Sequence, residues 1–118
     1  MTKIQKTRDY VVCADGFTMS VQASENHYCS PRADGAEVIY GRVEIGYPSE
    51  REPEFDEYVE DLSQDGKDID WTGSVYGWVP SDIVALVIAK HGGMVSGQIP
   101  KLGYINRIPI MKGNNNES

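Results

Sequence analysis

The sequence predicts a single α+β domain in which a small antiparallel β-sheet of about four strands is covered by one main α-helix at residues 81–91. Its length of 118 residues suits one domain. Short runs of β-branched and aromatic residues are typical of strands, and one later run combines helical spacing with signals at both ends. We expect the domain to span residues 1–112, followed by a flexible C-terminal tail at residues 113–118.

Residues 9–14 and 17–24 predict the first two strands. In the second run, apolar residues alternate with small polar ones, which is typical of a strand with one buried face and one polar face. Asp15-Gly16 separates the two runs, and this pair favours a type I′ turn. The two runs are therefore expected to form a β-hairpin.

Residues 38–47 predict the third strand, after a polar loop at residues 25–37. Val43, Ile45 and Tyr47 are expected to share one face of this strand because they are two residues apart.

The next predicted strand, at residues 74–79, leads directly into the helix. Ser81 is the expected N-cap, and Gly92-Gly93 supplies the C-terminal stop. We expect Ile83 and Val87 to be buried against the hairpin, on the face that Met19 and Val21 form.

Residues 50–70 carry all of the protein's net negative charge. The formal net charge is −7, and this segment contains ten acidic and two basic residues, so it carries −8 and the rest of the chain +1. Apolar residues at helical spacing indicate a possible short second helix near residues 54–62. An extended segment at the edge of the sheet is the competing interpretation.

The acidic segment is also the first candidate interaction surface. Its local negative field can steer a basic partner, although a solvated surface that aids solubility is the simpler interpretation. The candidate partner-binding residues are Glu54, Asp56, Glu57, Glu60 and Asp61.

A second candidate site would bind a small ligand. Arg32 can pair with a phosphate, and Tyr28 and Trp78 offer stacking faces. With His27, these residues form the alternative ligand-binding set, for which a small nucleotide is the expected ligand.

Catalytic and metal chemistry are not predicted. Cys13, Cys29, His27 and His91 are of zinc-ligand type, but their spacing fits no standard zinc site. Residues 61–66 resemble the first half of a calcium loop, and the match then fails. We expect no cofactor and no enzyme activity. The cysteines are expected to be free thiols in a reducing compartment, with a disulfide left open.

The sequence shows neither a secretory signal nor an apolar run of the length that a membrane span needs. Its acidic composition argues against direct binding to nucleic acid. Homo-oligomerisation is left open.

Five segments resemble a family of small uncharacterised proteins encoded by tailed bacteriophages and prophages. The resemblance covers about residues 9–93, and no active site can be carried over from the family. The segments are Asp15-Gly16-Phe17-Thr18-Met19-Ser20-Val21-Gln22-Ala23-Ser24, His27-Tyr28-Cys29-Ser30-Pro31-Arg32, Val43-Glu44-Ile45-Gly46-Tyr47-Pro48-Ser49, Val75-Tyr76-Gly77-Trp78-Val79-Pro80 and Lys90-His91-Gly92-Gly93.

The resemblance implies a small accessory protein that acts in the cytoplasm of an infected bacterium. Such proteins often inhibit host defence systems, including CRISPR effectors. The leading expectation is a non-catalytic inhibitor whose acidic surface binds a basic, nucleic-acid-binding site of a host defence protein or complex. The alternative is a sponge that sequesters a small signalling nucleotide.

Overall fold

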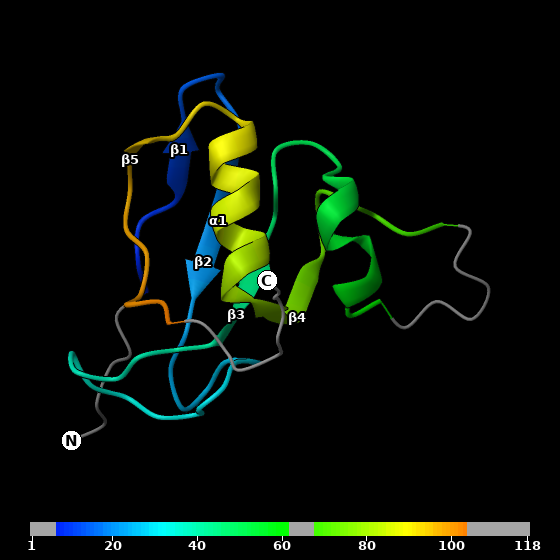
Figure 1. Ribbon diagram of the computed structural model, residues 1–118. Helices are drawn as coiled ribbons and strands as arrows, with labels where there is room; N and C mark the ends of the chain where they lie inside the picture. Colours follow the sequence, from blue (N-terminus) through cyan, green and yellow to red (C-terminus); the bar gives the residue numbers. More distant parts are fainter. Residues whose placement is uncertain (1–6, 62–67, 104–118) are drawn as a thin grey trace, which may run out of the picture.

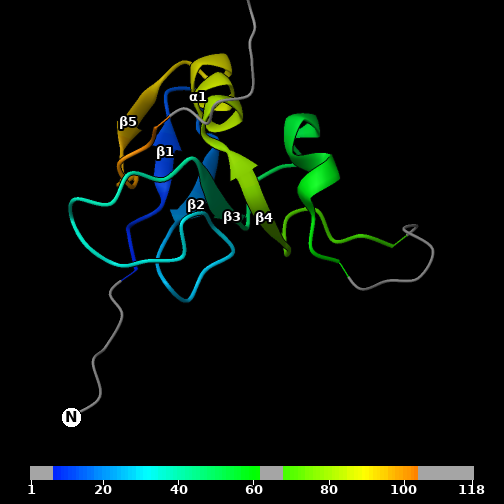
Figure 2. The ribbon, with the colours of Figure 1, turned by 60° about the horizontal axis from the view of Figure 1, so that its bottom comes forward.

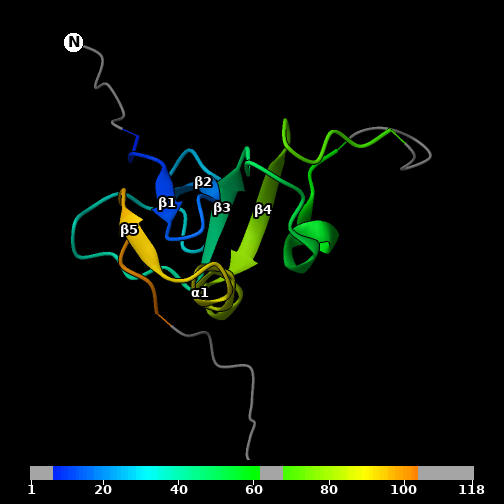
Figure 3. The same cartoon turned by 90° about the horizontal axis from the view of Figure 1, so that it is seen from above.

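The computed structural model describes residues 7–61 and 68–103, and it confirms the α+β class. Five antiparallel strands form one sheet in the order β4-β3-β2-β1-β5, and the helix α1 lies against one face of it (Figures 1 and 3). A 3-10 helix, η1, lies beyond β4, at the edge opposite β5. The elements are β1 (Val11–Cys13), β2 (Thr18–Gln22), β3 (Arg42–Gly46), η1 (Pro53–Tyr58), β4 (Val75–Pro80), α1 (Ser81–Lys90) and β5 (Met94–Ser96).

The predicted hairpin is present, but its turn is not of type I′. The Gly16 amide donates to the Cys13 carbonyl, and the Cys13 amide donates to the Phe17 carbonyl. Of the two turn residues, only Gly16 has a positive φ, 95°. This is a three-residue loop with glycine in the left-handed position. It leaves the Asp15 carboxylate free to accept from the Phe17 amide, at 2.9 Å.

Both faces of β2 are covered, which differs from the expected polar face. Met19 and Val21 belong to the core, but Ser20 and Gln22 are buried as well. The Gln22 side chain hydrogen-bonds both the amide and the carbonyl of Arg8, so the chain before β1 covers the second face. These hydrogen bonds provide partners for the buried side-chain amide of Gln22.

β3 is shorter than predicted, and Tyr47 does not share the buried face of Val43 and Ile45. Those two side chains are fully buried, whereas Tyr47 is 47% exposed. The backbone of Tyr47 has a φ of 52°, which turns the chain out of the strand before Pro48.

Residues 53–61 combine both structures that the sequence left open. The chain first forms η1 and then becomes extended, so that Val59 bridges Tyr76 and the Glu60 amide donates to the Val75 carbonyl at 2.8 Å. The extended part covers the outer edge of β4. Residue 62, the end of the predicted helix, lies outside the described residues.

α1 begins one residue earlier than its expected N-cap implied. The N-cap is Pro80, and Ser81 is the first helical residue, with its Oγ donating to the Gly103 carbonyl at 2.6 Å. At the other end, Gly92 and Gly93 have φ values of 92° and 95°, so the predicted glycine stop is confirmed.

The core lies between α1 and the sheet. Val84 and Val87 on α1 are fully buried in the same cluster as Met19, Val21 and Phe55, while Ile83 is half-buried at its border. The expected burial of Val87 is therefore confirmed, and that of Ile83 is partial. The strand β5 was not predicted. The predicted tail at residues 113–118 lies outside the described residues.

Candidate functional site

The acidic surface is carried by η1 and the extended residues that follow it. Glu54, Glu57 and Glu60 are exposed, whereas Asp56 and Asp61 are half-buried. Asp56 pairs with Arg51 at 2.8 Å, so its charge is locally balanced. The structure therefore places all five predicted residues on one segment, with three of their carboxylates exposed.

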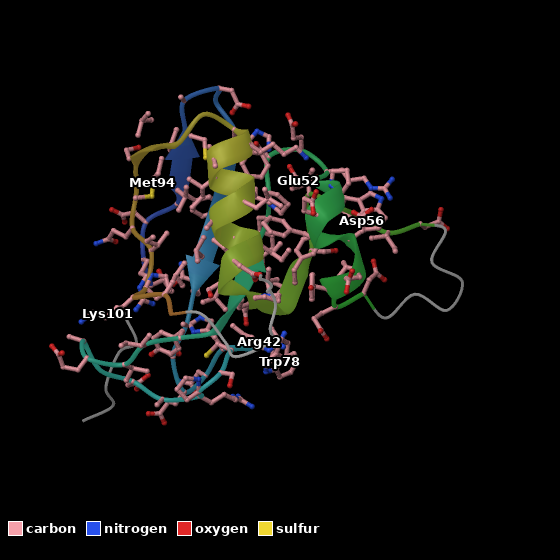
Figure 4. All side chains as sticks on the ribbon, viewed as in Figure 1. Arg42, Glu52, Asp56, Trp78, Met94 and Lys101 are labelled. Carbon is pink, nitrogen blue, oxygen red and sulfur yellow. The ribbon has the colours of Figure 1, made fainter. Side chains whose placement is uncertain are left out.

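The segment is anchored by two inward-facing residues. Phe55 is fully buried and packs against Tyr76, with ring centroids 5.9 Å apart. Glu52 is the N-cap of η1 and accepts from the Glu54 amide at 3.1 Å, while its own side chain is 2% exposed. In Figure 4, Glu52 lies on the α1 side of η1 and Asp56 on its outer side. The acidic surface thus has a fixed position relative to the sheet.

Glu52 belongs to a buried charged cluster that sequence analysis missed. Its carboxylate lies 2.8 Å from Lys90 Nζ and 2.8 Å from His91 Nε2. His91 Nδ1 lies 2.6 Å from Asp15 Oδ2, and Phe17 stacks on the imidazole with ring centroids 4.1 Å apart. We call Asp15, Glu52, Lys90 and His91 the buried charged cluster, after its two buried members Glu52 and His91; the side chains of Asp15 and Lys90 are 51% and 45% exposed. The sequence offers only two signals for this cluster: Glu52 is acidic, and His91 lies at the end of the predicted helix.

The cluster holds His91 as an imidazolium. Ionised carboxylates accept hydrogen bonds and donate none, so two carboxylate partners require a proton on each ring nitrogen. Burial by itself lowers the pKa of His91, but the hydrogen bonds to Glu52 and Asp15 outweigh it and raise that pKa. Burial likewise raises the pKa of Glu52, and the bonds from Lys90 and His91 reverse this into a lowered value. With both nitrogens engaged, His91 is a structural cation and has no lone pair for base catalysis.

The alternative ligand-binding residues are brought together only in part. Tyr28 and Trp78 stack with ring centroids 5.0 Å apart and an interplanar angle of 20°. Tyr28 and Arg32 line a common groove of about 520 Å³. His27 lines two other grooves instead, and its Nδ1 lies 2.6 Å from Ser24 Oγ. Arg32 and Trp78 are therefore brought together with Tyr28, and His27 is not.

These residues come from the loop between β2 and β3 and from the middle of β4. The loop extends from one end of the sheet (Figure 2). It is joined to β4 by a bond from the Trp78 amide to the Tyr28 carbonyl, at 3.0 Å. Arg42 and Trp78 lie together near the start of α1 (Figure 4), where Arg42 Nη1 donates to the Trp78 carbonyl at 3.3 Å.

Both cysteines are free and buried. Burial raises the pKa of the Cys13 and Cys29 thiols, which disfavours the reactive thiolate. Within residues 7–61 and 68–103, no group of three or more His, Cys, Asp or Glu side chains is arranged to hold a metal ion. The resemblance to a calcium loop falls mostly on residues outside these ranges.

Within the described part of the chain, no helix has the length and apolar character to cross a membrane. No family model, no curated protein and no solved structure matches this chain.

Proposed function

We propose that this is a non-catalytic accessory protein of a bacteriophage that binds a host defence protein or complex in the host cytoplasm. Its acidic surface would occupy a basic site that normally binds nucleic acid, and so inhibit the host protein. The phage context is supported by the resemblance in sequence alone. The binding mode is supported by the geometry of η1 and by the buried residues Phe55 and Glu52 that anchor it.

The observation that carries the proposal is that the exposed carboxylates lie on a segment whose position relative to the sheet is fixed by buried residues. A surface that only aids solubility needs no defined position, because its charges act through the overall repulsion between molecules. Here Glu54, Glu57 and Glu60 project from a short segment anchored by buried Phe55 and Glu52. Preorganised groups lose less entropy on binding than mobile ones. The segment is thus suited to replace phosphates at fixed positions.

The test compares two triple variants of equal net charge. One carries Glu54→Gln, Glu57→Gln and Glu60→Gln, and its net charge is −4. The matched control carries Asp9→Asn, Glu25→Gln and Glu37→Gln elsewhere on the surface, with the same net charge. Each is used with the native protein to capture proteins from a lysate of a bacterial host, at about 50 mM and about 500 mM salt.

We expect the native protein and the control to retain the same basic nucleic-acid-binding proteins at low salt, and the first variant to lose them. With a purified target, the first variant should associate more slowly, because exposed charges act mainly on the association rate. The proposal would be refuted if both triple variants captured the same proteins equally well, or if the native protein captured them equally at low and high salt.

A second candidate function is sequestration of a small nucleotide. It is favoured by the stacked rings of Tyr28 and Trp78 and by Arg32, which lines the same groove as Tyr28. Mass spectrometry of the extract from denatured purified protein would detect a bound nucleotide, and added nucleotides should then raise the melting temperature. An extract free of nucleotides and an unchanged melting temperature would rule this candidate out.

A further inference from the structure

The groove beside Tyr28 has an aromatic wall and two acidic residues. It is lined by Asn26, Tyr28, Arg32, Glu44, Glu60 and Val75, and its volume is about 520 Å³. We call it the Tyr28 groove. Glu60 also belongs to the acidic surface, so the two features are continuous on the molecule.

The aromatic wall is held open to solvent. Tyr28, which lines the groove, is 41% exposed, and Trp78, which does not line it, stacks on Tyr28 and is 38% exposed. Trp78 has a φ of 53°, in the left-handed region that bulky residues disfavour. Backbone strain of this kind gathers at binding sites, where the surrounding structure enforces it. The fold thus keeps an exposed aromatic pair in place against local preference.

The carboxylates are positioned against the same wall. Glu44 Oε1 accepts from the Tyr28 amide at 2.9 Å, which ties this side chain to the ring's own backbone. Glu60 and Tyr28 both lie next to the position that a side chain of Gly77 would occupy. A Cβ placed on Gly77 would lie 2.9 Å from Glu60 Oε2 and 3.1 Å from Tyr28 Cβ. The absence of a side chain at Gly77 therefore lets Glu60 and Tyr28 come close together over β4.

We propose that the Tyr28 groove binds the guanidinium group of an arginine side chain of the basic partner. This inference rests on the proposed function and names the group that anchors the partner. A guanidinium stacks on an aromatic face and donates to carboxylates in its plane, and it does both better than an ammonium. The lining contains two glutamates and one arginine, so its net charge favours a cation over the phosphate of a nucleotide.

The experiment uses three peptides of equal length: oligoarginine, oligolysine and oligocitrulline. Citrulline keeps the planar shape of arginine without its charge. Each peptide is titrated into the full-length protein, and the indole N–H signal of Trp78 is followed by NMR. We expect the tightest binding and the largest Trp78 shift with oligoarginine, weaker binding with oligolysine, and no binding with oligocitrulline.

Four single variants locate the site. Tyr28→Leu and Glu60→Gln should each weaken oligoarginine binding by about three- to thirty-fold, as expected for loss of a cation–π contact or a charged partner. Gly77→Ala should also weaken binding, because its Cβ would meet Glu60 Oε2 at 2.9 Å and Tyr28 Cβ at 3.1 Å and so displace these two lining side chains. Glu57→Gln is the matched control, since it removes an equal charge outside the groove, and it should change the affinity less than about threefold. Thermal melting verifies that each variant is folded.

The outcomes separate this inference from the proposed function. If the glutamine triple variant loses oligoarginine binding while Tyr28→Leu and Gly77→Ala retain it, the groove is not the anchor site and the acidic surface stands. If oligoarginine binds the native protein no more tightly than oligocitrulline does, the inference is wrong, whereas the proposed function is decided by the capture experiment with the two triple variants. If mononucleotides shift the Trp78 signal and oligoarginine does not, the groove is a nucleotide site and the inference is wrong.

Discussion

His91 Nε2 donates to Oε1 of Glu52 across 2.8 Å, and both side chains are almost completely buried. This bond joins the C-terminal end of α1 to the start of η1, which are 39 residues apart in the sequence. Breaking a buried ion pair leaves an uncompensated charge, and this costs more than the pair contributes as a unit. The acidic surface therefore depends on an interaction that lies underneath it.

Glu52→Gln tests this dependence. The amide cannot balance the charges of His91 and Lys90, so we expect the free energy of unfolding to fall by about 2–4 kcal/mol. Urea denaturation measures it. Glu54→Gln, two residues away and exposed, should change the stability by less than about 0.5 kcal/mol. Equal effects of the two variants would show that the buried pair is not important for folding.

The pH dependence of stability should have a component that depends on His91. The pKa of His91 is raised above its ordinary value of 6.5, so the favourable contribution is complete below that pH and is lost as the pH rises through the folded-state pKa. We expect the urea midpoint of the native protein to decline as the pH rises above 6.5 and passes through the folded-state pKa of His91. The decline should be absent in His91→Gln.

At acidic pH the carboxylates of the buried charged cluster produce the opposite trend. The pKa of Glu52 is lowered from its ordinary value of 4.5, so its contribution is present above that pH and is lost as the pH falls through the folded-state pKa. We expect this loss to be smaller in Glu52→Gln than in the native protein. If the native protein and Glu52→Gln lose the same amount of stability as the pH falls, the lowered pKa of Glu52 does not contribute to folding.

Val87→Ala should destabilise the protein more than Ile83→Ala. Val87 is fully buried, whereas Ile83 is half-buried at the border of the core. Large-to-small changes in a core cost about 2–5 kcal/mol, and the small volume of valine places Val87→Ala at the low end. Thermal and urea unfolding measure both. A larger effect at Ile83 would mean that α1 is rotated about its axis relative to the sheet.

Cys13 and Cys29 should react slowly with a thiol reagent in the native protein and rapidly in urea. Both are at most 2% exposed, and burial raises the pKa of both thiols. Quantifying alkylation by mass spectrometry at neutral pH checks this. Rapid labelling of either residue in the folded protein would show that its site opens to solvent.

The elements with local signals could be predicted, and those set by distant contacts could not. The alternation in β2 and the glycines after α1 specify their structures through neighbouring residues alone. Ser81 resembles an N-cap locally, but the fold places Pro80 there and directs the Ser81 hydroxyl to Gly103. Tyr47 follows the strand alternation, and only its backbone φ of 52° turns it outward.

The same distinction holds for the candidate sites. The acidic surface is visible in the sequence because its residues are neighbours. The buried charged cluster joins Asp15, Glu52 and His91, which come from three separate parts of the chain. The Tyr28 groove likewise needs Glu44 and Glu60, and neither shows a relation to Tyr28 before the strands are paired.

The placement of η1 beside β4 gives the protein a permanent electric dipole. The exposed carboxylates of Glu54 and Glu57 lie beyond one edge of the sheet, while the chain outside residues 50–70 is almost neutral. A dipole in the field of a positively charged body experiences a torque, and its negative end turns toward that body. The molecule would thus be oriented before any contact forms, and a larger fraction of encounters would begin with η1 facing the partner.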